Sequence, residues 1–143
     1  MVDRATVEAF LTERQRGWLT RDPEVLGRSH AEDGVVRSPI FANLQGRKAI
    51  TDAYQSLFRS FTDWQLSTRP ALIDGLRVAQ PFDVVATHTG TLLGFEPTGR
   101  RFEIHGVLLF TLTPDCLIAD EQRIYDFTGL LIQVGVLRGK PAF

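Results

Sequence analysis

The sequence of 143 residues lacks the features that mark several large classes of protein. Its single cysteine, Cys116, excludes an internal disulfide and any CxxC metal motif. The first residues, MVDRATVEAFLTERQ, carry charges every few positions and have no apolar core like that of a signal peptide. No stretch approaches the ~18 consecutive apolar residues of a membrane span. These absences favour an intracellular, cytoplasmic protein.

The chain also lacks an excess of charge of either sign. Sixteen Lys and Arg residues face 17 Asp and Glu residues, for a formal net charge of -1, which argues against a nucleic-acid-binding protein with a basic surface. The nucleotide, zinc and catalytic-triad motifs GxGxxG, GxxxxGK[ST], HExxH and GxSxG are missing. The three histidines, at positions 30, 88 and 105, have no close ligand spacing, so no metal site is expected. The expected partner is a small molecule, not nucleic acid or a membrane.

What is present indicates one globular domain. A length of 143 residues fits a single domain over residues 1–143, since domains usually contain roughly 100–200 residues. Hydrophobic residues make up 43% of the chain and charged residues 23%, which is sufficient for a full core.

The first part of the chain has helical spacing. Apolar side chains recur over residues 7–19 at the interval of one helical face, with the stem of Arg14 among them, and Asp3 is the expected N-cap. An Asp-Pro pair then predicts a second short helix over residues 22–30. A third amphipathic helix is predicted over residues 50–61.

The second part of the chain is typical of strands. A short strand is expected at Val35 and Val36, before the third helix. Further segments rich in Val, Ile, Leu, Phe and Thr follow, separated by turn sequences such as Asp74-Gly75 and Gln80-Pro81. The predicted strands cover residues 65–73, 77–79, 84–93, 101–113 and 117–127, and a closing helix is expected over residues 129–136. Helices followed by an antiparallel meander indicate an α+β domain, with a curved sheet against a helical layer and a cavity between them.

The C-terminal half, THTGTLLGFEPTGRRFEIHGVLLFTL followed by EQRIYDFTGLLIQVG, resembles the SnoaL-like polyketide cyclases, also called ester cyclases. These belong to the superfamily of nuclear transport factor 2, ketosteroid isomerase and limonene epoxide hydrolase. The resemblance implies a cone-shaped α+β barrel with an internal apolar pocket, assembled as a dimer or larger. It also implies ring closure of a polyketide ester by an aldol reaction, without a metal or organic cofactor.

The reactive residues of the relatives are replaced at the matching positions. Arg123 stands where the cyclases have an acid/base Asp, and Leu108 stands where their preceding strand has a His. The reactive residues of the epoxide hydrolases are also replaced, since Ser38 stands in the place of a water-holding Asn and His88 in the place of an Arg. The fold therefore predicts a pocket with a different set of reactive groups.

Alternation along the last strand places Glu121, Arg123 and Tyr125 on one face, which the resemblance turns inward. Either Arg123 forms a structural ion pair with Glu121, or it stays partly free and stabilises an enolate or carboxylate in the pocket.

The histidines allow different roles. His88 is predicted to face the concave side as a general base, with a structural hydrogen bond as the alternative. His105 is expected to point outward or into an oligomer contact. His30 is expected to act as a cation at a helix end.

Aromatic side chains on the helices are either core or pocket wall. Trp18 falls where the cyclases place an aromatic residue on the substrate rings, and Tyr54 has the same two interpretations. The predicted substrate-binding set is Trp18, Ser38, Tyr54, Leu108, Glu121 and Tyr125, with Arg123 and His88 as the predicted catalytic residues.

Two functions remain open at this point. One is a cofactor-independent enzyme acting on an apolar carbonyl compound, and the other is a non-catalytic binding protein that lost the acid/base Asp. A homodimer is expected, packed through an exposed sheet face near Val85 and His105.

Overall fold

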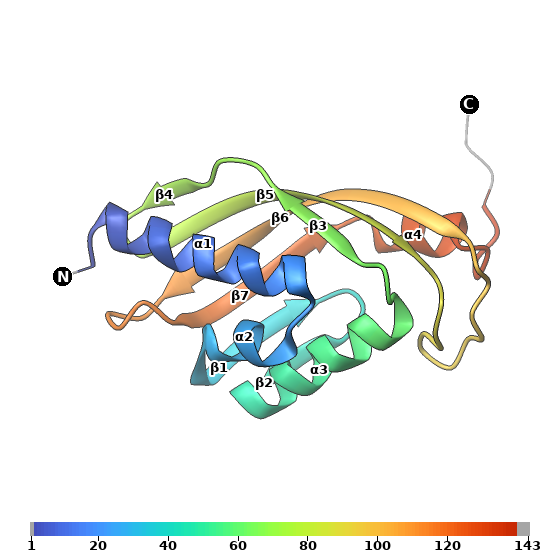
Figure 1. Ribbon diagram of the computed structural model, residues 1–143, viewed down its shortest axis with the longest axis horizontal. Coiled ribbons are helices and arrows are strands. Elements are labelled where there is room, and N and C mark those ends of the chain that lie inside the picture. The colour runs from blue at the N-terminus through green and yellow to red at the C-terminus, as the bar shows by residue number, and fades with distance from the viewer. Residues whose placement is uncertain (1, 140–143) are drawn as a thin grey trace.

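Seven strands form one curved, unclosed sheet, and helices pack against it (Figure 1). This computed structural model describes residues 2–139. The helices are α1 (Arg4–Thr20), α2 (Pro23–Arg28), α3 (Arg47–Ser60) and α4 (Phe127–Gln133). The strands are β1 (His30–Ser38), β2 (Ala42–Gln45), β3 (Gln65–Thr68), β4 (Leu72–Asp74), β5 (Arg77–Thr87), β6 (Arg101–Leu112) and β7 (Ile118–Tyr125). The predicted α+β class with a curved sheet is confirmed.

The strand order is β2-β1-β7-β6-β5-β3, with β4 also paired to β5. All pairs are antiparallel except β1 with β7, which is parallel. Figure 1 shows α1 lying across the long strands β5, β6 and β7, with α2 and α3 beside β1 and β2. The parallel pair brings the first strand of the chain next to the last one, so residues distant in sequence meet on β1 and β7.

The helix starts follow from their capping residues. The side chain of Asp3 accepts a hydrogen bond from the backbone N–H of Thr6 at 2.8 Å, and Asp22 caps α2 in the same way, so both predicted caps are confirmed. Asp126 accepts from the N–H of Gly129 at 2.8 Å, and this cap starts α4 two residues earlier than predicted.

The predicted turn at Gln80-Pro81 is wrong, because β5 runs through it without a break. Pro81 lies between the stretches of β5 that pair with β3 and with β4, where no ladder bond needs its missing N–H. Its carbonyl still accepts a hydrogen bond from Arg69 at 3.0 Å. The break occurs instead on the neighbouring chain segment, where residues 69–71 separate β3 from β4.

The strand predicted over residues 84–93 ends early, at Thr87. The N–H groups of Thr89 and Gly90 turn to donate to the carbonyl of Ser60, the last residue of α3. These bonds satisfy a helix carbonyl that has no partner within the helix. The chain leaves β5 after Thr87 because the next N–H groups bond to the C-terminal end of α3 and not to a neighbouring strand.

The first strand is longer than predicted, and β2 was not predicted. β1 begins at His30, where the sequence predicted the end of a helix, and it pairs with β7 from His30 onward with a register shift before Val35. Apolar alternation did not predict this part of the strand, because it contains the exposed polar residues Glu32 and Asp33.

The core lies between α1, α3 and the inner face of the sheet. Trp18, Tyr54 and Phe61 come from the helical side and its connections, and Phe82 and Leu108 come from the strands. Of the helices within residues 2–139, none combines the length and the apolarity that crossing a membrane requires.

Candidate functional site

Three side chains of β7 point inward, as alternation along the strand predicted. Glu121 is fully buried, Arg123 is 9% exposed and Tyr125 is half-buried, whereas Gln122 and Ile124 between them are exposed. Nε of Arg123 donates a hydrogen bond to Oε2 of Glu121 at 2.6 Å. Of the two alternatives for Arg123, the structure shows the ion pair with Glu121.

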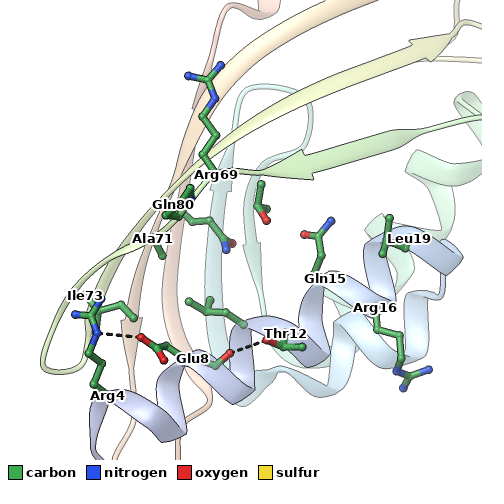
Figure 2. Close-up of a pocket in the computed structure, with 13 residues that line it drawn as sticks. Arg4, Glu8, Thr12, Gln15, Arg16, Leu19, Arg69, Ala71, Ile73 and Gln80 are labelled. Atoms are coloured by element: carbon green, nitrogen blue, oxygen red, sulfur yellow. Dashed lines mark hydrogen bonds and ion pairs between the residues drawn. The ribbon is translucent and has the colours of Figure 1, made fainter.

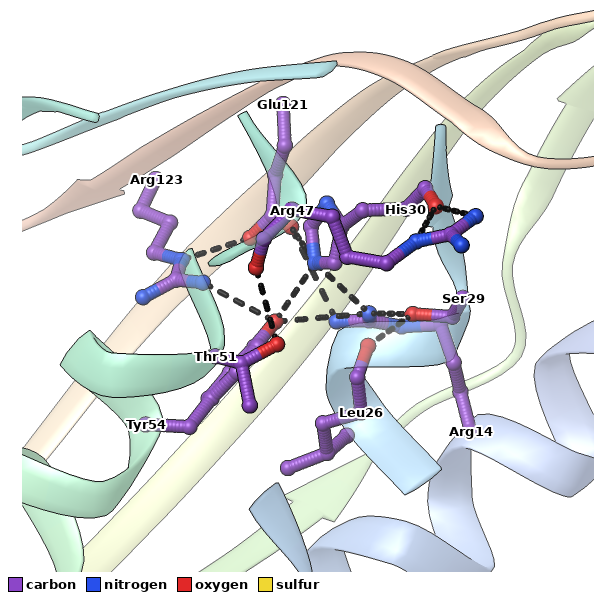
Figure 3. Close-up of polar contacts among 9 residues, drawn as sticks. All are labelled: Arg14, Leu26, Ser29, His30, Arg47, Thr51, Tyr54, Glu121 and Arg123. Atoms are coloured by element: carbon purple, nitrogen blue, oxygen red, sulfur yellow. Dashed lines mark hydrogen bonds and ion pairs between the residues drawn. The ribbon is translucent and has the colours of Figure 1, made fainter. Parts of the chain in front are cut away.

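This ion pair belongs to a larger group of buried polar residues, the charge cluster, which consists of Arg14, His30, Tyr54, Glu121 and Arg123 (Figure 3). The Tyr54 hydroxyl lies at its centre. It accepts from Nη2 of Arg123 at 3.0 Å and from Nη1 of Arg14 at 3.4 Å, and it lies 2.8 Å from Nε2 of His30. The cluster thus joins α1, β1, α3 and β7.

The Tyr54 hydroxyl fixes the tautomer of His30. Because it accepts from two guanidinium groups, its own hydrogen is free for the third neighbour, Nε2 of His30. His30 then carries its proton on Nδ1, and this atom is buried without a hydrogen-bond partner among the described residues.

The expectation that His30 acts as a cation at a helix end is wrong. Its side chain is fully buried, and burial together with the charges of Arg14 and Arg123 lowers its pKa to about 3, against the opposing charge of Glu121. His30 is therefore neutral at pH 7. Its carbonyl accepts two hydrogen bonds from Arg47, at 2.9 and 2.6 Å.

Arg14 was missed as a site residue, although a signal was present. Its position on the apolar face of the first helix predicted a buried stem, and the structure buries the guanidinium as well, with 2% of the residue exposed. Nη1 of Arg14 donates to the hydroxyl of Ser29 at 2.6 Å, and its Nη2 lies 3.8 Å from Oε1 of Glu121. The guanidinium also lies 5.0 Å from the ring centre of Phe110.

The two arginines determine the ionisation of Glu121. Burial alone would raise the pKa of this carboxyl, but the charges of Arg123 and Arg14 outweigh burial and lower the pKa to about 2. In the opposite sense, burial would lower the pKa of Arg123, and the charge of Glu121 outweighs it and raises the pKa. Both groups are therefore charged at neutral pH.

A small inner cavity lies beside the cluster. Trp18, Ser38, Leu108, Arg123 and Tyr125, all predicted site residues, line it together with apolar side chains of the core. Its volume of about 20 Å³ is enough for about one water molecule. Tyr54 and Glu121 are not in its lining, but both form hydrogen bonds with Arg123, which is.

Arg123 lines this cavity and has one guanidinium nitrogen without a hydrogen bond within residues 2–139. Its Nε is bonded to Glu121 and its Nη2 to Tyr54, while Nη1 makes no hydrogen bond to any described residue. Phe41 and Tyr125 are the half-buried members of the lining, and the others are buried. These two side chains mark the mouth of the cavity.

The structure does not bring His88 to this cavity. His88 is fully buried after the end of β5, where its Nδ1 accepts from the backbone N–H of Thr98 at 3.2 Å and its ring packs against Phe61. Burial lowers its pKa. Its hydrogen bond to a neighbouring segment matches the structural alternative to a general base.

His105 points outward, as predicted. Its side chain is 63% exposed and pairs with Asp83 on β5. No three His, Cys, Asp or Glu side chains within residues 2–139 gather in a way that could hold a metal ion.

A larger and more open groove lies between α1 and the segment that joins β3 to β4 (Figure 2). Its volume is about 660 Å³. Figure 2 shows the ion pair of Arg4 with Glu8 along one side and Gln80 on the other. Gln15, which also lines this groove, donates to the carbonyl of Leu66 at 2.9 Å. The sequence singled out none of these residues.

The family model described as SnoaL-like polyketide cyclase matches residues 8–134. The chain belongs to this family. The match spans α1 through α4, so it includes every residue of the charge cluster. A comparison with curated proteins gives no match.

Solved structures share the fold. AclR from Streptomyces galilaeus superposes with a TM-score of 0.81 at 24% identity, over 98% of this chain and 87% of that one. TsrD from Streptomyces laurentii gives a TM-score of 0.83 at 22% identity, over 96% of this chain and 100% of the other. A protein from Catenulispora acidiphila with a ketosteroid isomerase-like fold gives 0.76 at 18% identity, over 92% and 97% of the two chains.

Proposed function

We propose that this protein is a cofactor-independent enzyme of the SnoaL-like type. It binds an apolar carbonyl compound in the inner cavity, and Arg123 stabilises the negative charge that develops on the carbonyl oxygen. The observation that carries this proposal is that Arg123 lines a mostly apolar cavity while its Nη1 makes no hydrogen bond to any described residue.

The two anchored edges of Arg123 make it a fixed electrophile. Glu121 and Tyr54 hold its Nε and Nη2 at 2.6 and 3.0 Å, so the guanidinium need not reorient when an enolate forms. A donor positioned in advance, where water is largely excluded, stabilises developing charge far better than the same group in water.

The cavity offers donors and no strong proton acceptor. No Asp, Glu or His is part of its lining among the described residues. Burial raises the pKa of Tyr125, so its phenol stays protonated and can donate to a second oxygen. We therefore assign no proton transfer to His88. The α-proton passes to a water molecule, for which the cavity has room, so the substrate class is one whose α-proton is already acidic, such as a β-dicarbonyl compound.

A second candidate function is binding without turnover. The lack of a proton acceptor in the cavity lining favours it. For either function, the small volume of about 20 Å³ requires Phe41 or Tyr125 to move before a ligand can enter. Both functions share the same site, and they differ in whether the bound carbonyl compound reacts.

Exchange of α-protons separates the two functions. Ethyl benzoylacetate is incubated with the protein in D2O at mildly acidic pD, and loss of its methylene proton signal is followed by NMR. Binding is followed in parallel by the fluorescence of Trp18 and Trp64, which both line the cavity. Exchange faster than the buffer supports the enzyme; binding with exchange at the buffer rate supports the second function. Absence of both would contradict this site.

A further inference from the structure

We infer that the ligand of the inner cavity binds as an anion, through a carboxylate or an enolate held on Nη1 of Arg123. The inference rests on the proposed function and specifies the charge state of its substrate class. It follows from the balance of charges in the cluster behind the cavity.

The charge cluster contains more cations than anions. Arg14 and Arg123 are 2% and 9% exposed, and among the described residues of the cluster Glu121 is the one carboxylate. Arg47 adds a third guanidinium at its border, bound to the carbonyl of His30. The buried cluster therefore carries at least one positive charge in excess.

A single carboxylate serves both arginines. Oε2 of Glu121 accepts from Arg123 at 2.6 Å, and Oε1 lies 3.8 Å from Nη2 of Arg14. The neighbouring Asp120 does not contribute, because its carboxylate is on the other side of β7 and pairs with Arg37 at 2.7 Å. A buried charge without a counter-ion is costly, so an anion that reaches the cluster gains a strong interaction.

An anion in the inner cavity can reach this excess charge. Arg14 also lines a separate surface pocket, but its Nε and Nη2 are buried without a hydrogen-bond partner in the described part of the chain. Arg123 lines the inner cavity, and its Nη1 makes no hydrogen bond to any described residue. Ser38 and Tyr125 line the same cavity, and the Ser38 hydroxyl interacts with the Tyr125 phenol, which can donate to a second oxygen. One cation, one phenol and an aromatic wall suit an apolar molecule with two adjacent oxygens that share a negative charge.

Benzoate and benzamide form a matched pair of probes, since they have nearly the same shape and differ in charge. Their dissociation constants at pH 7 are measured by quenching of Trp18 and Trp64. We expect benzoate to bind at least about tenfold more tightly, in line with the greater strength of charge-assisted hydrogen bonds. Equal binding of the two probes would overturn the inference.

Two buried variants that do not line the cavity sharpen the test. Glu121→Gln removes the counter-ion of Arg123 and should raise the preference for benzoate several-fold. Arg14→Met leaves Glu121 to neutralise Arg123 alone and should lower the preference several-fold. The ratio of two affinities in the same sample does not depend on the fraction of folded protein. Shifts in the same direction, or none in either variant, would contradict the charge balance.

The failures of the two proposals can be told apart. If benzoate and benzamide bind equally while the exchange of ethyl benzoylacetate persists, the anion inference is wrong and the proposed enzyme stands. If neither probe binds and no exchange occurs, both are wrong, because the cavity is then not a ligand site.

Discussion

Arg123 and Glu121, two residues apart on the inner face of β7, form a buried ion pair with an Nε to Oε2 distance of 2.6 Å. Both side chains are removed from water, so neither charge can be relieved by solvent when its partner is lost. The pair stabilises the fold, and through it Glu121 holds Arg123, the proposed oxyanion donor, in place.

Removal of Glu121 should therefore be costly. We expect Glu121→Leu to lower the free energy of unfolding at pH 7 by about 3–5 kcal/mol, because two guanidinium groups lose their buried counter-ion. The matched control is Asp120→Ala on the same strand, whose ion pair with Arg37 is partly exposed and should matter little. Urea denaturation measures both, and similar losses for the two variants would contradict the charge cluster.

Acidification should destabilise the protein in two steps. His30 takes up a proton in the unfolded chain below its ordinary pKa of 6.5 but in the folded protein only near 3, so stability falls as the pH drops from 6.5. Glu121, with a pKa of about 2 when folded against 4.5 unfolded, adds to the loss below pH 4.5. Each group contributes up to about 1.4 kcal/mol per pH unit within its window.

The share of His30 in the first of these steps can be assigned by substitution. His30→Asn removes one titrating group, so the urea midpoint should fall less steeply between pH 6.5 and 4.5 than in the wild type. His88→Asn is the matched comparison, since burial lowers the pKa of His88 too and the remaining slope should belong to it. A His30→Asn variant with the wild-type slope would contradict the assignment to His30.

Loss of the Tyr54 hydroxyl should loosen Arg123. Tyr54→Phe removes the acceptor of Nη2 of Arg123 and the hydrogen-bond partner of His30, with an expected cost of about 1–3 kcal/mol. It should also slow the exchange of ethyl benzoylacetate, because the guanidinium is then held by Glu121 alone. Tyr125→Phe should affect stability less, since that residue is half-buried at the mouth of the cavity. Equal stability losses would argue against a central role for Tyr54.

Gly90 should not tolerate a side chain. A Cβ at this position would lie 2.0 Å from the carbonyl oxygen of Arg59, a backbone atom that cannot move without disturbing α3. Gly90→Ala should lower the thermal midpoint by several degrees, because Gly90 is held against the end of α3 by the hydrogen bond from its N–H to the carbonyl of Ser60. Thr91→Ala, at an exposed neighbour, is the control. A midpoint unchanged in Gly90→Ala would contradict the close approach.

The elements that depend on local pattern could be predicted from the sequence. The helices around Trp18 and Tyr54 follow from apolar spacing, and the starts of α1 and α2 at Asp3 and Asp22 follow from capping chemistry. The continuous β5 could not be predicted, because whether Pro81 breaks a strand depends on which neighbours need its N–H. That is decided by pairing with segments elsewhere in the chain.

The same distinction applies to the site. Glu121 and Arg123 could be paired from the sequence because two residues on one strand share a face. His30 and Arg14 could not be added, since they reach Glu121 only through the parallel pairing of β1 with β7 and the packing of α1 over the sheet. His88 carries the right chemistry in the sequence, yet the early end of β5 takes it away from the cavity.

The most direct test of Arg123 as the oxyanion donor is the exchange rate of ethyl benzoylacetate in wild type and in Arg123→Lys. Lysine keeps the charge that Glu121 needs, so the fold should persist, but its one ammonium cannot bind Glu121 and also face the cavity. We predict a folded variant, verified by circular dichroism, whose exchange is about 100-fold slower. A folded Arg123→Lys protein that exchanges at the wild-type rate would contradict the account.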